Sequence, residues 1–292
     1  MELGKAIDAD WRDFKVCGGV RVRCYVSEPG DCGDARPLLL LHSINAAPSA
    51  MEMRPLFQQW AGSRPVYAPD LPGFGHSQRG ALPYSPAFYA EAITDLLSQI
   101  EGEPPDVVAL SLTSEFLVRA VSESGRPVHS LVLISPTGLG SREPPGPESG
   151  ERIGKILKLG WLSRGLWRAL VSAPSIRYFL GQAFYGKAPD ALVNYAQQTA
   201  RQPDATDAPF AFLTMQLFTR QALESLYANL SCPTLILYDE DPNIDFDRLP
   251  DLTVRSHWVT ARRIVPTRGL PQWERPEETA QALTEFWQQL TQ

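Results

Sequence analysis

The chain has 292 residues, of which 43% are hydrophobic and 21% charged, so it can bury a large core and is not a disordered chain. Its net charge of −6 argues against general nucleic-acid binding, and we expect no nucleic-acid partner. Residues 1–13 carry four acidic side chains and no long apolar run, so we expect no secretory signal. The longest apolar stretches of the chain are far shorter than the roughly 20 residues that a membrane helix needs, so we expect no membrane span. These features predict a cytoplasmic protein whose cysteines are reduced.

The first half of the sequence predicts strands that alternate with helices. Two short alternating runs, Phe14–Cys17 and Val20–Val26, are typical of an antiparallel hairpin, and the continuous apolar run Leu38–Leu41 is typical of a strand buried on both faces. We then expect a helix at 49–61, a strand at 65–68, a helix at 85–100, a strand at 106–110, a helix at 115–123 and a strand at 130–134. This order predicts an α/β protein with a doubly wound, mostly parallel sheet.

The alternation then stops and later resumes. Residues 138–150 are rich in Gly, Pro and Ser and predict a hinge, and the chain from there to about residue 228 reads as helical. Strands at 235–238 and 262–265 and a helix at 277–290 complete the pattern. We therefore predict a core formed by residues 1–137 and 229–292, interrupted by a helical cap, residues 138–228.

The segment Asp106-Val-Val-Ala-Leu-Ser111-Leu-Thr113 places a serine directly between an apolar strand and a helix. This pattern resembles the nucleophile elbow usually written G-x-S-x-G, in which small flanking residues let strand and helix approach. Ala109 fits that requirement, whereas Thr113 is β-branched and departs from it. A helix N-cap serine is the structural alternative for Ser111.

Three further motifs carry a resemblance to the α/β-hydrolase family across nearly the whole chain. Asp70-Leu-Pro-Gly-Phe-Gly-His-Ser77 is similar to its D-x-x-G-x-G-x-S loop. Leu39-Leu-Leu-His-Ser43-Ile-Asn45 is similar to its strand and His-Gly loop, with Ser43 in place of the glycine. Leu270-Pro-Gln-Trp-Glu274 is similar to the stretch that opens its last helix. The resemblance implies the α/β-hydrolase fold with a helical cap.

The resemblance also implies roles for individual residues. Ser111 would be the nucleophile, and the backbone N–H of Leu112 with that of Ile44 or Asn45 would form the oxyanion hole. The acid would follow the strand at 235–238, where Asp241 is the choice, with Asp239 and Glu240 as alternatives. No metal and no cofactor is implied.

The catalytic histidine of the family has no counterpart at its usual place. In the family it immediately precedes the stretch that Leu270–Glu274 resembles, and here that position is Gly269. A serine hydroxyl needs an adjacent base at neutral pH, so the triad is incomplete. His42, beside the predicted oxyanion loop, is the nearest candidate for an auxiliary base, and the resemblance implies a structural role as the alternative, since its counterpart in the family mainly packs that loop. Structural or surface roles are expected for the other histidines, His76, His129 and His257.

The predicted cap is both aromatic and basic. Residues 151–187 hold seven Lys or Arg and one Glu, a local charge of +6, and the spacing of apolar and basic residues in the first part predicts an amphipathic helix with a tryptophan. The aromatic side chains predict an apolar small molecule bound in a pocket under the cap. The basic face indicates either a solvated lid, contact with an anionic partner, or peripheral contact with a membrane surface.

Three functions therefore stand as hypotheses. The first is a serine-hydrolase-like enzyme acting on an ester or lipid-like apolar substrate, which the Ser111 elbow favours. The second is a catalytically degenerate binding or scaffold protein, favoured by Gly269, Ser43 and Thr113 at positions where the family has other residues. The third is a non-hydrolytic enzyme on the same fold.

Overall fold

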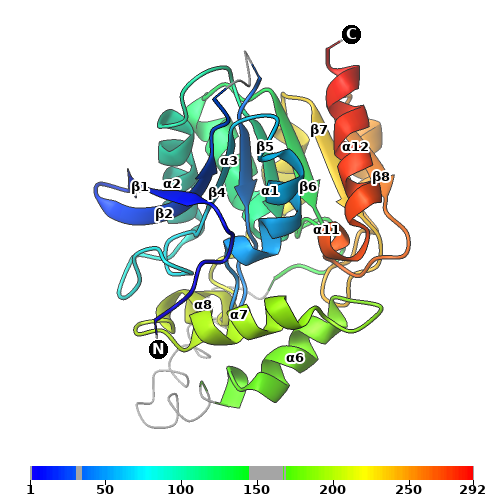
Figure 1. The fold of residues 1–292 in the computed structure, drawn as a ribbon. Coiled ribbons are helices and arrows are strands. Elements are labelled where there is room, and N and C mark those ends of the chain that lie inside the picture. The colour runs from blue at the N-terminus through cyan, green and yellow to red at the C-terminus, as the bar shows by residue number, and fades with distance from the viewer. Residues whose placement is uncertain (1, 31–34, 145–166, 168, 292) are drawn as a thin grey trace.

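The structure is a computed structural model that describes residues 2–30, 35–144, 167 and 169–291. Its centre is an eight-stranded sheet with strand order β1-β2-β4-β3-β5-β6-β7-β8 (Figure 1). The strands are β1 (Asp10–Val16), β2 (Val20–Ser27), β3 (Leu38–Leu41), β4 (Val66–Pro69), β5 (Asp106–Leu110), β6 (Ser130–Ile134), β7 (Thr234–Tyr238) and β8 (Val259–Arg263). β1 pairs with β2 and β2 with β4 in antiparallel register, and the other pairs are parallel. The mostly parallel sheet predicted from the sequence is confirmed.

The central strands read as continuous apolar runs because they are buried on both faces. Leu39 and Val107 point into one core cluster, while Leu38 and Val108 point into the other. α2 (Pro86–Ser98) and α3 (Thr113–Ser124) pack in the first cluster, and α1 (Arg54–Trp60) and α12 (Pro276–Gln289) in the second. The short elements are η1 (Ala50–Met53), α10 (Leu249–Arg255) and α11 (Pro271–Glu274).

Several element boundaries follow from local chemistry that the sequence shows. Ser85 is the N-cap of α2, since its side chain accepts from the Phe88 N–H, and Pro86 follows at the first helical position. β8 begins at Val259, three residues before the predicted start. Its central residues are exposed, so it lacks the apolar run that located the inner strands. α10 and α11 were missed because each is at most two turns long.

Between β6 and β7 the described chain is helical, as predicted. It contains α6 (Ala173–Gln182), α7 (Asp190–Ala200), α8 (Asp207–Leu213), α9 (Ala222–Ser225) and η2 (Tyr227–Asn229). Figure 1 shows α6, α7 and α8 beyond one end of the sheet. That end is the carboxyl edge of the strands, because Arg79, in the loop after β4, donates to Thr199 of α7. Whether residues 138–228 form a separate cap stays a prediction.

The first residues of the chain also reach α7. The Gly4 carbonyl accepts from the Tyr195 hydroxyl of α7 at 3.1 Å, and it lies 2.8 Å from Nε2 of His76 in the loop after β4. Leu3 and Ile7 are buried in the same cluster as α7. The N-terminal segment thus contacts both α7 and the loop after β4.

Candidate active site

Ser111 occupies a sharp turn at the carboxyl end of β5. Its backbone is left-handed, with φ +55°, and its N–H donates to the Ile134 carbonyl of β6 at 2.8 Å. A left-handed non-glycine residue costs about 1–3 kcal/mol and persists where its surroundings impose it. Ser111 is half-buried between the fully buried Leu110 and Leu112. The turn therefore holds one hydroxyl at the edge of an otherwise apolar junction.

Thr113 fits this junction better than its branched side chain led us to expect. It is fully buried, and its hydroxyl donates to the His42 carbonyl at 2.7 Å. The bond joins the start of α3 to the end of β3, where the predicted oxyanion loop begins. Thr113 thus replaces a small residue with a specific polar contact.

The N–H groups of Leu112, Ile44 and Asn45 donate no hydrogen bond to any other described residue. Leu112 and Ile44 are buried, so these donors are withheld from bulk water. Buried donors without a protein partner are uncommon and call for a ligand or a developing charge. The pattern is what an oxyanion hole requires, and the assignment of these three residues stays a prediction.

His42 is fully buried, and both ring nitrogens are engaged. The Leu71 N–H donates to Nε2 at 2.9 Å, so Nε2 is an acceptor, and Nδ1 donates to the Ser43 carbonyl at 2.6 Å. Burial lowers the pKa of His42, which favours the neutral ring. No lone pair is left to take a proton from Ser111. Of the two roles weighed for His42, auxiliary base and structural residue, these contacts favour the structural one.

Asp241 lies beside position 269. A Cβ built on Gly269 would lie 2.7 Å from Oδ2 of Asp241, so a side chain at this position would start against the carboxylate. The other oxygen, Oδ1, accepts from the Asn243 N–H at 2.8 Å. Burial raises the pKa of Asp241 to about 6, opposed in part by Arg268. The structure thus brings together the predicted acid and the position where the family has histidine.

The two alternative acids have other partners. Asp239 forms an ion pair with Arg263 and accepts from the Thr267 N–H at 2.9 Å. Glu240 is exposed, and its carboxylate raises the pKa of the neighbouring Tyr185 hydroxyl. Of the three acids, only Asp241 has a carboxylate oxygen among the atoms nearest to a Cβ built on Gly269.

Two buried carboxylates near these loops were missed by the sequence reasoning. Glu52 of η1 accepts from the Ser43 N–H and from the Ser43 and Asn45 side chains, and burial raises its pKa to about 7. Glu115 of α3 accepts from the Thr137 hydroxyl and from the Thr219 N–H, and burial raises its pKa to about 7 as well. A glutamate within an apolar helical pattern was the available signal for Glu115.

The remaining histidines have the structural or surface surroundings we expected. His129 bonds to Asp106 at the opposite edge of the sheet, His76 contacts the Gly4 carbonyl, and His257 packs on Trp258. A group with metal-ligand chemistry, Cys17, Glu91 and Asp95, lies on the β1–β2 turn and α2. These two elements carry none of the predicted site residues.

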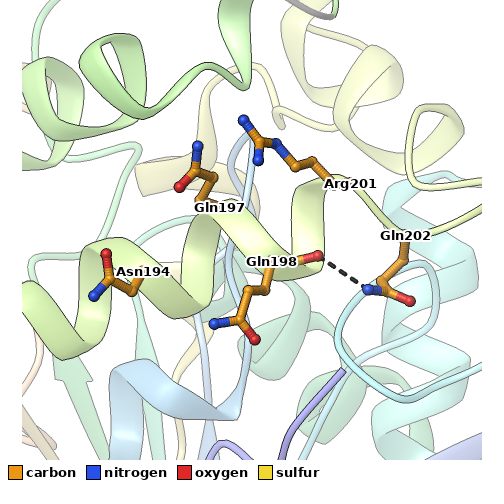
Figure 2. A pocket seen from close by; sticks show the side chains of 5 residues that line it. All are labelled: Asn194, Gln197, Gln198, Arg201 and Gln202. Carbon is orange, nitrogen blue, oxygen red and sulfur yellow. Dashed lines mark hydrogen bonds between the residues drawn. The ribbon is translucent and has the colours of Figure 1, made fainter. Parts of the chain in front are cut away.

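A polar cavity of about 500 Å³ lies along α7, apart from the predicted catalytic residues. Figure 2 shows the side chains that line it, Asn194, Gln197, Gln198, Arg201 and Gln202. Gln202 donates to the Gln198 carbonyl, so the lining groups partly bond to one another. This cavity is not the apolar pocket expected from the sequence, and that pocket stays a prediction.

Most of the basic stretch lies outside the described residues, including Arg152, Lys155, Lys158, Arg164 and Arg168. The two described cations of the stretch, Arg177 and Lys187, both pair with Asp190 at 2.7 Å. Nearby, Tyr178, Phe179 and Tyr185 are exposed. In the described part of the chain, no helix has the length and hydropathy needed to cross a membrane. Contact with a membrane surface stays a prediction.

Comparison with known proteins gives one family match along most of the chain. The family model described as "Alpha/beta hydrolase family" matches residues 38–282. A 2-hydroxymuconate semialdehyde hydrolase from Pseudomonas sp. strain CF600 is 27% identical over 126 residues, 42% of this chain. The match spans less than half of that relative, 43% of its length.

Solved structures resemble the whole fold. A serine hydrolase involved in carbazole degradation has a TM-score of 0.76 at 16% identity, covering 96% of this chain and 99% of that one. An enzyme described as an aryl esterase, from Burkholderia cenocepacia, has a TM-score of 0.75 at 15% identity, covering 97% and 99%. At these identities the likeness establishes the fold.

Proposed function

The chain belongs to the alpha/beta hydrolase family, and from that premise we propose that it is a serine-hydrolase-like protein with Ser111 as nucleophile. Asp241 is the acid, and glycine stands where the base would be. The observation that carries the proposal is the strained turn at Ser111, whose φ of +55° a serine adopts only under constraint. The three unpaired N–H groups of Leu112, Ile44 and Asn45 support it.

The proposed reaction is acyl transfer. The Ser111 hydroxyl loses its proton to water as its oxygen attacks the carbonyl carbon of an ester, and the oxygen that becomes negative accepts from the Leu112 N–H and from that of Ile44 or Asn45. When this intermediate collapses, the C–O bond to the alcohol breaks, the alcohol leaves with a proton from water, and the acyl group stays on Ser111. The proton of Ser111 has no imidazole to receive it, because position 269 is glycine and both nitrogens of His42 are engaged. In a protease that lacks its base, turnover falls on the order of 10⁶-fold. We therefore expect slow acylation.

The proposed substrate is an ester with an apolar acyl or ring group. The aromatic side chains of the inserted segment favour such a group. One similar protein supports it by its description as an aryl esterase.

The backbone at position 269 favours a second candidate, a binding protein without turnover. Gly269 has φ +110°, which a side-chain-bearing residue rarely adopts, and a Cβ there would approach Asp241 too closely. The loop is thus shaped for glycine and not for an imidazole. Replacing Gly269 by histidine is consequently a poor restoration test, because the variant would be strained.

A fluorophosphonate probe tests the proposal, with added imidazole as an external base. The proposal expects slow labelling of the wild type, mapped to Ser111 by mass spectrometry, absent in Ser111→Ala and faster with imidazole. Absence of labelling under all conditions, together with saturable binding of an uncleaved aryl ester, would favour the binding protein. Labelling that persists in Ser111→Ala would remove Ser111 as the nucleophile.

A further inference from the structure

Glu52 is a buried carboxylate that the proposed reaction does not use. It lies in η1, which is fixed at its start because Ser49 caps the Met51 N–H and Asp70 accepts from the Ala50 N–H at 2.8 Å. Glu52 is 3% exposed. A charged group in such a place persists only where it is well bonded, so its partners indicate what it does.

All partners of the Glu52 carboxylate belong to the loop after β3. Oε2 accepts from the Ser43 N–H at 2.9 Å, and Oε1 accepts from the Ser43 hydroxyl at 3.1 Å and from the Asn45 amide at 3.2 Å. The Asn45 amide also donates to the Ser43 hydroxyl at 2.7 Å, and its oxygen accepts from the Ala47 N–H. These bonds hold the loop on both sides of Ile44 and leave the Ile44 and Asn45 N–H groups unused.

The main-chain carbonyl of Glu52 faces the other part of the site. It accepts from the side chains of Gln272 at 3.2 Å and Trp273 at 2.9 Å, both in α11. α11 begins two residues after Gly269. Glu52 therefore joins two parts of the site. Its carboxylate bonds to the loop that carries the Ile44 and Asn45 N–H groups, and its main-chain carbonyl bonds to the segment that follows position 269.

We infer that Glu52 is a positioning residue that fixes the Ile44 and Asn45 N–H groups for the oxyanion and ties their loop to α11. The inference rests on the proposed function, since it gives Glu52 a purpose in acylation of Ser111. The three bonds from Ser43 and Asn45 all go to an acceptor-only carboxylate. An amide at this position would turn one acceptor into a donor that faces donors.

The groups around Glu52 make its ionisation observable. Ser43 and Asn45 face the carboxylate and are neutral. The charged groups nearby have other partners, since Asp70 accepts from the Ala50 and His76 N–H groups and Arg54 stacks on the Trp273 ring. Burial raises the pKa of Glu52 to about 7, so its charge changes near neutral pH. Glu115 offers a matched control, because it is equally buried, has a pKa of about 7, and touches neither Ser43 nor Asn45.

The experiment measures labelling of Ser111 by a fluorophosphonate against probe concentration, between about pH 5 and about pH 9. Glu52→Gln should lower the limiting labelling rate about 10- to 100-fold while the half-saturating concentration changes less than about twofold. In the wild type and in Glu115→Gln, the rate should show an added step as pH passes about 7. In Glu52→Gln that step should vanish and leave only the gradual rise that any serine without a base shows as hydroxide increases. Ser43→Ala removes one hydrogen bond to Glu52 and should also lower the limiting labelling rate. This variant still tests the inference if Glu52→Gln does not fold.

Amide hydrogen exchange over residues 42–47 provides a readout that does not need the nucleophile. The inference expects faster exchange in Glu52→Gln and unchanged exchange in Glu115→Gln. If Ser111 never labels but exchange behaves as expected, the positioning role stands and the proposed function fails. If Ser111 labels and both Glu52→Gln and Ser43→Ala match the wild type in rate and exchange, the inference is overturned.

Discussion

The two edges of the central sheet handle buried carboxylates in opposite ways. At the amino edge, Asp106 is nearly fully buried and pairs with Arg64 at 2.6 Å, with His129 at 2.7 Å and with the Ser130 hydroxyl. Trp287 of α12 donates to Ser130 at 3.1 Å and stacks under the Arg64 guanidinium. This carboxylate has a cation and a complete set of donors.

At the carboxyl edge, Asp239 pairs with Arg263, but three other carboxylates are held by neutral donors. Glu52 and Glu115 accept only from hydroxyl, amide and backbone groups, and Asp241 has a backbone donor and a side facing Gly269. Burial raises the pKa of each, to about 7, 7 and 6 respectively. Ser111 and Gly269, both with positive φ, lie at this edge too.

We propose that the amino edge contributes more to stability and the carboxyl edge more to the proposed function. Removing one partner of a buried ion pair leaves an uncompensated charge and strongly destabilises the fold. Carboxylates with a raised pKa and a serine at positive φ are common at binding or catalytic sites. Four substitutions test this contrast.

Asp106→Asn should have the largest effect on stability. It removes the counter-charge of Arg64, whose side chain is 11% exposed, and an unpaired buried charge costs about 3–5 kcal/mol. Urea denaturation measures the loss. Glu123→Gln, in an exposed pair with Arg119, is the control and should cost less than about 1 kcal/mol. Similar losses in both variants would mean that the amino edge is not specially stabilised.

Glu115→Gln should flatten the pH dependence of stability. The folded-state pKa of Glu115, about 7, lies above its ordinary value of 4.5, so between these values the folded state keeps a proton that the unfolded chain has lost. Stability therefore falls as pH rises through this window, by up to about 3 kcal/mol for this group. Denaturation at several pH values should show that fall reduced in the variant. An unchanged slope would contradict the raised pKa.

Gly269→Ala should cost about 2 kcal/mol, because alanine is strained at φ +110° and its Cβ meets Asp241. Gly125→Ala is the matched control, since Gly125 also has positive φ but open space around it, and should cost about 1 kcal/mol. Thermal denaturation compares the two. Equal losses would show that the contact with Asp241 adds nothing.

Thr113→Val should have the smallest effect, a loss of about 1 kcal/mol. The change keeps the shape of the side chain and removes its hydrogen bond to the His42 carbonyl. Thr113→Ser keeps the hydroxyl and should retain the bond. Denaturation of both variants checks this, and a valine variant as stable as the wild type would mean that the junction does not depend on the bond.

The sequence predicted the sheet well because its inner strands are short apolar runs with turn residues on either side. β3, β5 and β6 have the predicted bounds. The outer strands were placed less well, since the first half of β1 and most of β8 are exposed and carry no alternating or apolar run.

The site was predictable where a motif fixes the backbone, as at Ser111, and unpredictable where contacts come from distant segments. No pattern in the sequence near Glu52 predicts its hydrogen bonds to Ser43 and Trp273, because those contacts form only when β3, η1 and α11 pack together. Likewise, the engagement of both His42 nitrogens depends on Leu71, 29 residues away.

The N-terminal segment has a practical consequence. The Gly4 carbonyl is shared by Tyr195 of α7 and His76 of the core, so any outward swing of α7 has to break its bond to the first residues. A fluorophore attached near residue 4 would then report that swing by a change in emission when an aryl ester is added.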